Sequence, residues 1–398
     1  MGIVPSRELS DLLVEAGAQD PSLCYQCNRC SSGCPTGAAM SLAPSRLMRL
    51  AQLGLKDRII RDPSIWRCLG CDSCTQHCPY KVSVRKLIEL MRQSTVQDHW
   101  LSGNREIFGT DEALSKGLDA LDIMSERVKQ YRNVSGEDNE NRLAWTSNLP
   151  QKPEGIDHRE GSETVYFVGC VSAMFPMSYG IPQSFAAVLE KTGIPFTTLG
   201  KGEWCCGFPL LMAGQLEQAR EFMAHNVEEV EKIGAKRVVM TCPSCHYMWK
   251  NVYPKELRRT LDFEVVTASE FLYEKTLAGK IRFSEARKPG IVTYHDPCDL
   301  GRKGGKFDEP REVLKQVPGF EVVEMENNRE HALCCGGGGD LETFQPELTV
   351  EVASKRIAQA AAAGADHLVS ACPQCVRTLS KSAKANKLRI RVMDIVQF

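Results

Sequence analysis

Two stretches decide the N-terminal fold: residues 24–35 read CYQCNRCSSGCP, and residues 68–79 read CLGCDSCTQHCP. Both have the spacing Cys-x2-Cys-x2-Cys-x3-Cys-Pro. In this motif the three closely spaced cysteines bind one [4Fe–4S] cluster, whereas the cysteine before proline binds the cluster of the other motif. We therefore predict two cubane clusters, one on Cys24, Cys27, Cys30 and Cys78 and the other on Cys68, Cys71, Cys74 and Cys34.

Zinc and disulfide bonds are the alternatives for these cysteines. Zinc prefers two Cys-x2-Cys pairs in a tetrahedron, so a three-cysteine loop ending in Cys-Pro, present twice, favours iron–sulfur clusters. Disulfide-rich proteins are usually short and secreted, whereas this chain has 398 residues and its first residues show no apolar signal-peptide core. We therefore expect a reducing cytoplasm, with possible peripheral attachment to the inner face of the membrane through a partner.

The segment between the two motifs favours a helical ferredoxin. Residues 42–60 have leucines at helical spacing and a proline suited to the first turn. Residues 84–96 indicate another helix. Compact bacterial ferredoxins join their motifs through β-hairpins, so this helical insert predicts the α-helical type of two-cluster ferredoxin.

The other ten cysteines form two further motifs of five. The first comprises Cys170, the pair in WCCGFPLLMAG (204–214) and the pair in RVVMTCPSCHYMWK (237–250). The second comprises Cys298, the pair in LCCGGGGDLET (333–343) and the pair in HLVSACPQCVRTL (367–379). Equivalent cysteines lie 128 to 130 residues apart, which indicates a duplicated unit.

Each duplicated unit alternates strands and helices. Residues 165–168 and 291–294 are equivalent strand-like runs, and residues 216–233 and 348–363 indicate helices. Such alternation predicts α/β layers with parallel sheets. The predicted fold class is α+β multidomain, with a helical two-cluster ferredoxin domain followed by two α/β units related by pseudo-two-fold symmetry.

These patterns predict four segments. Residues 1–100 form the ferredoxin domain, residues 101–162 a helical segment and a polar linker, residues 163–288 the first α/β unit and residues 289–398 the second. The linker prediction rests on the Gly, Pro, Asn and charged residues of SGEDNENRLAWTSNLPQKPEGIDHREGSE (135–163). Trp145 is expected to pin this segment to a neighbouring surface.

Composition excludes several classes of protein. Hydrophobic residues make up 42% of the chain and charged residues 25%, with a formal net charge of -1, as in ordinary globular proteins. The chain has no long basic tract, which argues against a nucleic-acid partner. It also has no apolar run of the roughly 20 residues that span a bilayer.

The Cys-Cys-Gly sequences change the interpretation of the later motifs. A lone Cys-x2-Cys pair is equally compatible with half a zinc ribbon or a redox dithiol. Five thiolates exceed what one cubane needs, and the glycines allow close backbone approach to a cofactor. We therefore predict that Gly207, Gly336 and Gly337 help to bind a cofactor, the alternative being a flexible loop.

The cysteine pattern resembles the heterodisulfide reductase family. The five-cysteine motifs are similar to the CCG repeats of its B-type component, and the first hundred residues resemble its C-type component. A chain with both parts resembles the D-type component, their natural fusion. Iron–sulfur subunits of glycolate and glycerol-3-phosphate dehydrogenases share this architecture, but some keep only one intact five-cysteine motif. Both motifs are intact here, which favours the disulfide-reductase interpretation.

The resemblance implies two noncubane [4Fe–4S] clusters, which would carry the catalysis. Their ligands would be Cys170, Cys205, Cys206, Cys242 and Cys245 for the first, and Cys298, Cys334, Cys335, Cys372 and Cys375 for the second. The implied activity is reduction of a disulfide such as CoM-S-S-CoB, small or protein-bound. The implied partner is an electron-donor subunit (a flavoprotein, a ferredoxin-type subunit or a membrane cytochrome) within a multisubunit complex.

Two histidines lie close to cysteines of the second five-cysteine motif. His295, three residues before Cys298, and His331, three before Cys334, are candidate proton donors to a leaving thiolate, the alternative being a supporting or surface role.

The first rival to a disulfide reductase is an electron-transfer subunit of a flavin dehydrogenase or quinone-linked complex, without substrate chemistry of its own. The second is a zinc scaffold without redox chemistry.

Overall fold

The computed structural model describes residues 6–100, 112–284 and 289–398. These residues form two compact units, each built from more than one stretch of chain. Unit 1 comprises Met1–Ser125, Pro209–Leu216 and Gly336–Val352, and unit 2 comprises Glu126–Phe208, Glu217–Cys335 and Ala353–Phe398. The four segments predicted from the sequence stay a prediction.

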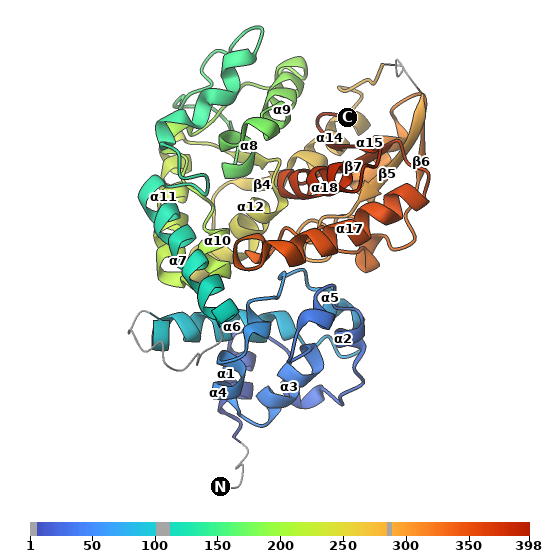
Figure 1. Ribbon diagram of the computed structural model, residues 1–398. Helices are drawn as coiled ribbons and strands as arrows, with labels where there is room; N and C mark the ends of the chain where they lie inside the picture. Colours follow the sequence, from blue (N-terminus) through green and yellow to red (C-terminus); the bar gives the residue numbers. More distant parts are fainter. Residues whose placement is uncertain (1–5, 101–111, 285–288) are drawn as a thin grey trace. The chain divides into compact units, whose positions relative to one another are not determined.

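In the N-terminal part of unit 1, the described residues form helices joined by loops and turns, without a strand, as predicted (Figure 1). Its α-helices are α1 (Glu8–Glu15), α2 (Arg29–Ser32), α3 (Pro44–Gln52), α4 (Lys56–Ile60), α5 (Ser73–His77) and α6 (Val84–Thr95), and α7 (Glu112–Tyr131) begins in this unit. Short 3₁₀ turns are η1 (Pro21–Leu23), η2 (Gly37–Ala39) and η3 (Pro63–Ile65), and a π turn, η4 (Val96–Trp100), continues α6. The predicted helix over 84–96 is confirmed.

The helix predicted over 42–60 is wrong as a single element. It divides into α3 and α4, with Gly54 between them at φ +70°. A left-handed glycine ends an α-helix, because it turns the chain away from the helix axis. The apolar faces of both helices still join one core with α6, in which Leu47, Ile59 and Leu87 are completely buried.

Unit 2 contains two four-stranded parallel sheets with the same strand order. The first runs β2-β1-β3-β4 and the second β6-β5-β7-β8, so β1 and β3 correspond to β5 and β7. The strands are β1 (Thr164–Phe167), β2 (Phe196–Thr197), β3 (Arg237–Met240), β4 (Glu264–Thr267), β5 (Gly290–His295), β6 (Phe320–Val323), β7 (His367–Ser370) and β8 (Arg391–Asp394). The predicted duplication and parallel sheets are therefore confirmed.

Helices alternate with these strands. The first repeat holds α8 (Cys170–Met174), α9 (Gly180–Lys191), α10 (Phe208–Met212), α11 (Leu216–Ile233), α12 (Pro243–Tyr247), α13 (Tyr253–Glu256) and α14 (Ala268–Leu277). The second holds α15 (Asp308–Lys315), α16 (Leu341–Phe344), α17 (Pro346–Ala362) and α18 (Pro373–Ala385). The 3₁₀ segments are η6 (Asn139–Asn148), η7 (Pro176–Ser178), η8 (Gly200–Gly202) and η10 (Arg329–His331), and η9 (Met248–Val252) is a π segment. One core joins the sheets of both repeats, including Tyr166 and Phe185 from the first and Tyr294 and Val369 from the second.

The predicted polar linker is partly folded. The first half of segment 101–162 holds the expected helix as α7, while residues 101–111 lie outside the described part of the chain. In the second half, Asn139–Asn148 forms η6, and its side chains Arg142 and Trp145 are buried within unit 2. Trp145 thus pins the segment as expected, whereas Arg142 had no predicted role.

A helix that crosses a bilayer must be long and apolar. Within residues 6–100, 112–284 and 289–398, none of the helices is long and apolar enough to cross a membrane.

Candidate metal centres

The two N-terminal cysteine loops adopt the same backbone conformation. In the first, Gln26 and Asn28 have φ of 62° and 67°, and in the second, Gly70 and Asp72 both have φ of 61°. A left-handed φ is uncommon outside glycine and marks an imposed turn. This conformation brings N–H groups to sulfur: the Gly70 backbone N–H donates to Cys68 Sγ at 3.3 Å, and Gln26 Nε2 donates to Cys24 Sγ at 3.3 Å.

The structure groups Cys34 of the first motif with three cysteines of the second, as the predicted exchange of fourth ligands requires. A small pocket is lined by Cys68, Cys71 and Cys74 of the second motif together with Cys34 of the first. Burial raises the pKa of Cys34 to about 12, and negative charge on Cys71 and Cys68 acts in the same direction. Since thiolates repel one another in a buried space, a cation or cluster is needed to hold all four deprotonated.

The other N-terminal group is more open. Burial raises the pKa of Cys30, and the charges of Cys24 and Cys78 act in the same direction, which places one cysteine of the second motif beside two of the first. Cys27 is exposed. A hydrogen bond from the Arg29 backbone N–H lowers the pKa of Cys27, so this loop presents its ligand near solvent.

The first five-cysteine set lies at the carboxyl ends of β1 and β3, where parallel sheets usually bind ligands. Cys170 follows β1 and Cys242 follows β3. Contacts between thiols connect all five members: Cys170 to Cys205, Cys205 to Cys206, Cys206 to Cys245 and Cys245 to Cys242. Hydrogen bonds from Cys205 and Cys245 lower the pKa of Cys206 to about 6.

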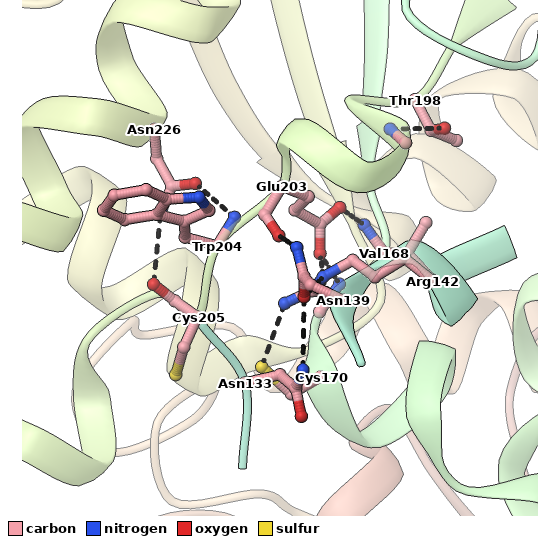
Figure 2. Close-up of polar contacts among 12 residues, drawn as sticks. Asn133, Asn139, Arg142, Val168, Cys170, Thr198, Glu203, Trp204, Cys205 and Asn226 are labelled. Atoms are coloured by element: carbon pink, nitrogen blue, oxygen red, sulfur yellow. Dashed lines mark hydrogen bonds and ion pairs between the residues drawn. The ribbon is translucent and has the colours of Figure 1, made fainter. Parts of the chain in front are cut away.

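A buried ion pair fixes Cys170 (Figure 2). Arg142, from the predicted linker, donates from Nη2 to Cys170 Sγ at 3.3 Å and from Nη1 to Glu203 Oε1 at 2.5 Å. Glu203 also accepts the backbone N–H groups of Val168 and Gly169 at 2.9 and 2.8 Å. The carboxylate therefore ties the end of β1 to the guanidinium that contacts the thiol.

Neighbouring side chains fix the adjacent cysteine pair by its backbone. Asn226 Oδ1 accepts the Trp204 N–H at 3.0 Å, and Asn226 Nδ2 donates to the Cys205 carbonyl at 3.1 Å (Figure 2). The Tyr253 hydroxyl donates to the Cys206 carbonyl at 3.1 Å. Gly207 then takes φ +82°, a conformation that turns the chain at low cost only in glycine.

The second set gathers four cysteines and a histidine. Cys335 contacts Cys334, Cys375 and His295, and Cys375 contacts Cys372. The ligand atoms of His295, Cys335 and Cys375 all lie within 4.8 Å of one another. Hydrogen bonds from Cys334, Cys375 and His295 lower the pKa of Cys335.

An arginine sets the tautomer of His295. Arg356 Nε donates to His295 Nδ1 at 3.0 Å, and both side chains are buried. Because Nδ1 accepts a hydrogen bond, the proton of the neutral ring is on Nε2, the atom left to donate toward Cys335. Burial lowers the pKa of His295, which keeps the ring neutral.

The remaining predicted residues occupy different settings. Cys298, half-buried after β5, contacts Asp299 Oδ1 at 3.8 Å. Gly336 has φ +83°, matching Gly207 of the first repeat, whereas Gly337 lies in the same run without a left-handed φ. His331 is exposed beside Glu330, so a buried proton donor is available only from His295 of the two candidates.

The two five-cysteine sets lie close together within unit 2. Ser244, inside the first Cys-x2-Cys, donates to Asp299 Oδ2 at 2.5 Å, and Asp299 adjoins Cys298. A hydrogen bond with Cys375 lowers the pKa of Cys372. Burial and the negative charge of Cys242 act in the opposite direction and raise this pKa to about 12. The ends of the two repeats therefore meet at their cysteine loops.

A lysine completes this junction between the repeats. Lys303 Nζ pairs with Asp299 Oδ1 at 2.6 Å, and both side chains are buried. The carboxylate of Asp299 is therefore held between a cation of the second repeat and the Ser244 hydroxyl of the first.

This donor set fits iron–sulfur clusters. The groups offer soft sulfur ligands, most of them buried or half-buried, and N–H donors point at Cys24, Cys68 and Cys170, which is how proteins bind and tune such clusters. Sequence reasoning found the cysteines but missed Arg142, Glu203 and Arg356. No spacing rule connects these three to the cysteines, because the fold alone brings them there.

Comparisons with known proteins agree with this donor set. The "4Fe-4S dicluster domain" model matches residues 23–83, and the "Cysteine-rich domain" model matches residues 164–250 and 292–380. The D-type component of the dihydromethanophenazine:CoB–CoM heterodisulfide reductase of Methanosarcina barkeri is 34% identical, over 94% of this chain and 92% of its own. Its counterpart from Methanosarcina mazei is 31% identical over the same shares. The EtfAB:quinone oxidoreductase of Syntrophomonas wolfei is 25% identical, over 85% of this chain and 46% of its own.

Proposed function

The chain belongs to the D-type family of heterodisulfide reductase iron–sulfur proteins, and on that premise we propose that it reduces a disulfide. Electrons would enter at the N-terminal ligand sets and be used at the two five-cysteine sets. The overall reaction takes two electrons and two protons and yields two thiols from one disulfide.

The meeting of the two five-cysteine sets carries this proposal. Ser244 and Asp299 connect the first Cys-x2-Cys to the residue after Cys298, and Cys242 is near enough to Cys372 for their charges to interact. Cleavage of a disulfide separates two sulfur atoms and needs one electron for each. Two adjacent one-electron centres suit this reaction without a flavin.

The proposed cofactors are two cubane and two noncubane [4Fe–4S] clusters, which would supply one-electron transfer. Cys24, Cys27, Cys30 and Cys78 would hold one cubane, and Cys34, Cys68, Cys71 and Cys74 the other. Each five-cysteine set would hold one noncubane cluster. Gly207 and Gly336 would keep side chains away from the adjacent cysteine pairs, with Gly337 extending that opening in the second repeat.

His295 is the proposed proton-carrying residue. Its ring hydrogen-bonds Cys335, and Arg356 donates to its Nδ1, which leaves Nε2–H as the ring donor. A proton at this atom lies next to the sulfur ligands, where a thiolate product needs one. Because His295 is buried, bulk water is excluded from this proton transfer.

The proposed substrate is a low-molecular-weight or protein-bound disulfide, with CoM-S-S-CoB as the model from the relatives' names. The proposed partner is an electron-donor subunit in a multisubunit complex. We place the complex in the cytoplasm, with peripheral attachment to the membrane through that partner.

An electron-relay subunit is the second candidate, favoured by the similarity to the EtfAB:quinone oxidoreductase of Syntrophomonas wolfei. A relay would pass electrons between a flavoprotein and a quinone partner and would not act on a disulfide.

An assay with reduced viologen separates the two candidates. Anaerobically purified, cluster-loaded protein is mixed with reduced viologen and a panel of disulfides that includes CoM-S-S-CoB. We expect disulfide-dependent oxidation of the viologen with two thiols formed per disulfide. Full reduction of the clusters without any thiol product would favour the relay.

A further inference from the structure

Helix α6 carries a buried arginine that contacts three separate stretches of the chain within unit 1. Arg92 is 3% exposed. Its Nη2 donates to the Cys68 carbonyl at 2.8 Å, and its Nη1 donates to the carbonyls of Met212 and Gly339 at 2.8 and 3.1 Å. Its Nε donates to the Ile65 carbonyl at 2.9 Å.

The carbonyls that Arg92 contacts belong to residues that lie in or close to three cysteine motifs of the sequence. Cys68 is the first cysteine of the second N-terminal motif. Met212 follows Cys206 by six residues, and Gly339 follows Cys335 by four. One guanidinium therefore connects the second N-terminal ligand loop to the stretches that leave both Cys-Cys-Gly sequences.

Backbone packing at the same place leaves no room for side chains. A Cβ at Gly338 would lie 2.7 Å from the Leu69 carbonyl oxygen, and a Cβ at Gly339 would overlap the Cys68 carbonyl oxygen. Gly70, between Cys68 and Cys71, faces the Met212 sulfur. Close contact with this ligand loop thus explains the glycines at positions 338 and 339.

Covalent geometry limits how far each pair of cysteines can be from Arg92. Four residues of fully extended chain span about 14 Å, and six span about 21 Å. Cys335 and Cys206 therefore lie within those distances of the carbonyls that Arg92 holds. Both noncubane ligand sets are thereby connected by short stretches to one N-terminal ligand loop.

The charge of Arg92 also acts at this loop. A guanidinium stays protonated in proteins, and burying it is costly unless polar groups surround it. Four carbonyl oxygens accept its hydrogen bonds, and it stacks on Trp66 at 5.2 Å from the ring centre. Positive charge beside a cluster ligand stabilises the more negative, reduced state of the cluster.

We propose that Arg92 is a positioning residue that fastens the stretches after both Cys-Cys-Gly sequences to the Cys68 ligand loop within unit 1, and that its charge raises the reduction potential of the cluster held by this loop. The proposal rests on the proposed function for the cluster on which this charge acts. The tie itself and the effect of its charge do not depend on the substrate.

Two substitutions of Arg92 separate the effect of its hydrogen bonds to several carbonyls from the effect of its positive charge. Arg92→Gln loses the charge and most of the hydrogen bonds, whereas Arg92→Lys keeps the charge but lacks the fork of donors that reaches several carbonyls. Arg46→Gln is the matched control, because Arg46 is also in unit 1 and donates to a carbonyl, of Ser41, from an exposed position.

Two readouts on each variant test the proposal without any disulfide. Hydrogen–deuterium exchange should be at least tenfold faster in residues 209–216 and 336–345 for both Arg92 variants. In EPR-monitored redox titration, the midpoint potential of one cubane should shift downward in Arg92→Gln and stay near the wild-type value in Arg92→Lys. Arg46→Gln should change neither quantity.

Unchanged exchange in both stretches, or an unchanged potential in Arg92→Gln, would overturn the proposal. If Arg92→Gln fails to retain iron, the hydrogen–deuterium exchange of Arg92→Lys alone tests the proposal, since that variant keeps the buried charge. Absence of disulfide reduction by the wild-type protein would refute the proposed function while leaving both of these readouts intact.

Discussion

At the scale of the residue, the centres depend on buried arginines as much as on cysteines. Arg142 contacts Cys170 Sγ and pairs with Glu203, with side chains 2% and 1% exposed. Arg356 orients His295. A buried cation next to a thiol offsets the repulsion between thiolates, and its hydrogen bonds fix the ligand in one rotamer.

Replacing Arg142 by alanine should destabilise unit 2 by about 3–5 kcal/mol, because Glu203 would stay buried without its partner. The measurement is urea denaturation of anaerobic protein followed by circular dichroism. Lys201→Ala is the control, because Lys201 pairs with Glu140 nearby but both are mostly exposed, and such pairs contribute at most about 1 kcal/mol. Equal effects of the two substitutions would contradict a structural role for the buried pair.

The cysteines were predictable from sequence and the arginines were not, for a physical reason. Cys68, Cys71 and Cys74 act through local spacing, which the sequence displays directly. Arg142 lies 28 residues before Cys170, in a polar stretch that resembles a linker. Its partner Glu203 reaches it only because the sheet of the first repeat brings both to the end of β1.

At the scale of the element, loop conformation repeats where the motif repeats. The same two positions of each N-terminal loop take a left-handed φ, and Gly207 and Gly336 turn the chain after each cysteine pair. Strand and helix positions were predicted well because hydrophobic periodicity is local: residues 216–233 form α11 as expected. The division of α3 from α4 depends on one glycine, which leucine spacing does not reveal.

Cys34→Ser should damage the cluster held mainly by the second N-terminal motif, because Cys34 lines the same pocket as Cys68, Cys71 and Cys74. EPR of the reduced protein would show loss of one cubane signal. Cys30→Ser is the matched variant and should affect the other signal. Identical spectral losses in the two variants would contradict the exchange of fourth ligands.

Gly339→Ala should loosen the contact between the glycine run and the Cys68 loop. Its φ of +62° alone would cost about 1–2 kcal/mol in alanine, and overlap with the Cys68 carbonyl adds to this cost. Gly305→Ala is the control, since Gly305 has φ +71° with open space around it. In thermal unfolding, Gly339→Ala should lower the melting temperature more than Gly305→Ala does. Equal decreases would contradict a steric clash between a Cβ at position 339 and the Cys68 carbonyl.

At the scale of the whole molecule, the duplication supports the proposed reduction of a disulfide. Two sheets of the same strand order place equivalent cysteines at equivalent strand ends, and the repeats meet at these loops. A fold with one such unit could donate single electrons, whereas two adjacent units match the two electrons of a disulfide. The sequence displayed the duplication through its constant offset, but the meeting of the repeats required the folded chain.

Disulfide reduction by cysteine variants tests this central claim most directly. Rates with reduced viologen are compared for wild type, Cys206→Ser, Cys335→Ser and the double variant, with EPR confirming that the cubanes are reduced in each. If both five-cysteine sets act as one unit, each single variant and the double variant should fall to the same background rate. Substantial disulfide reduction by Cys335→Ser would contradict the account.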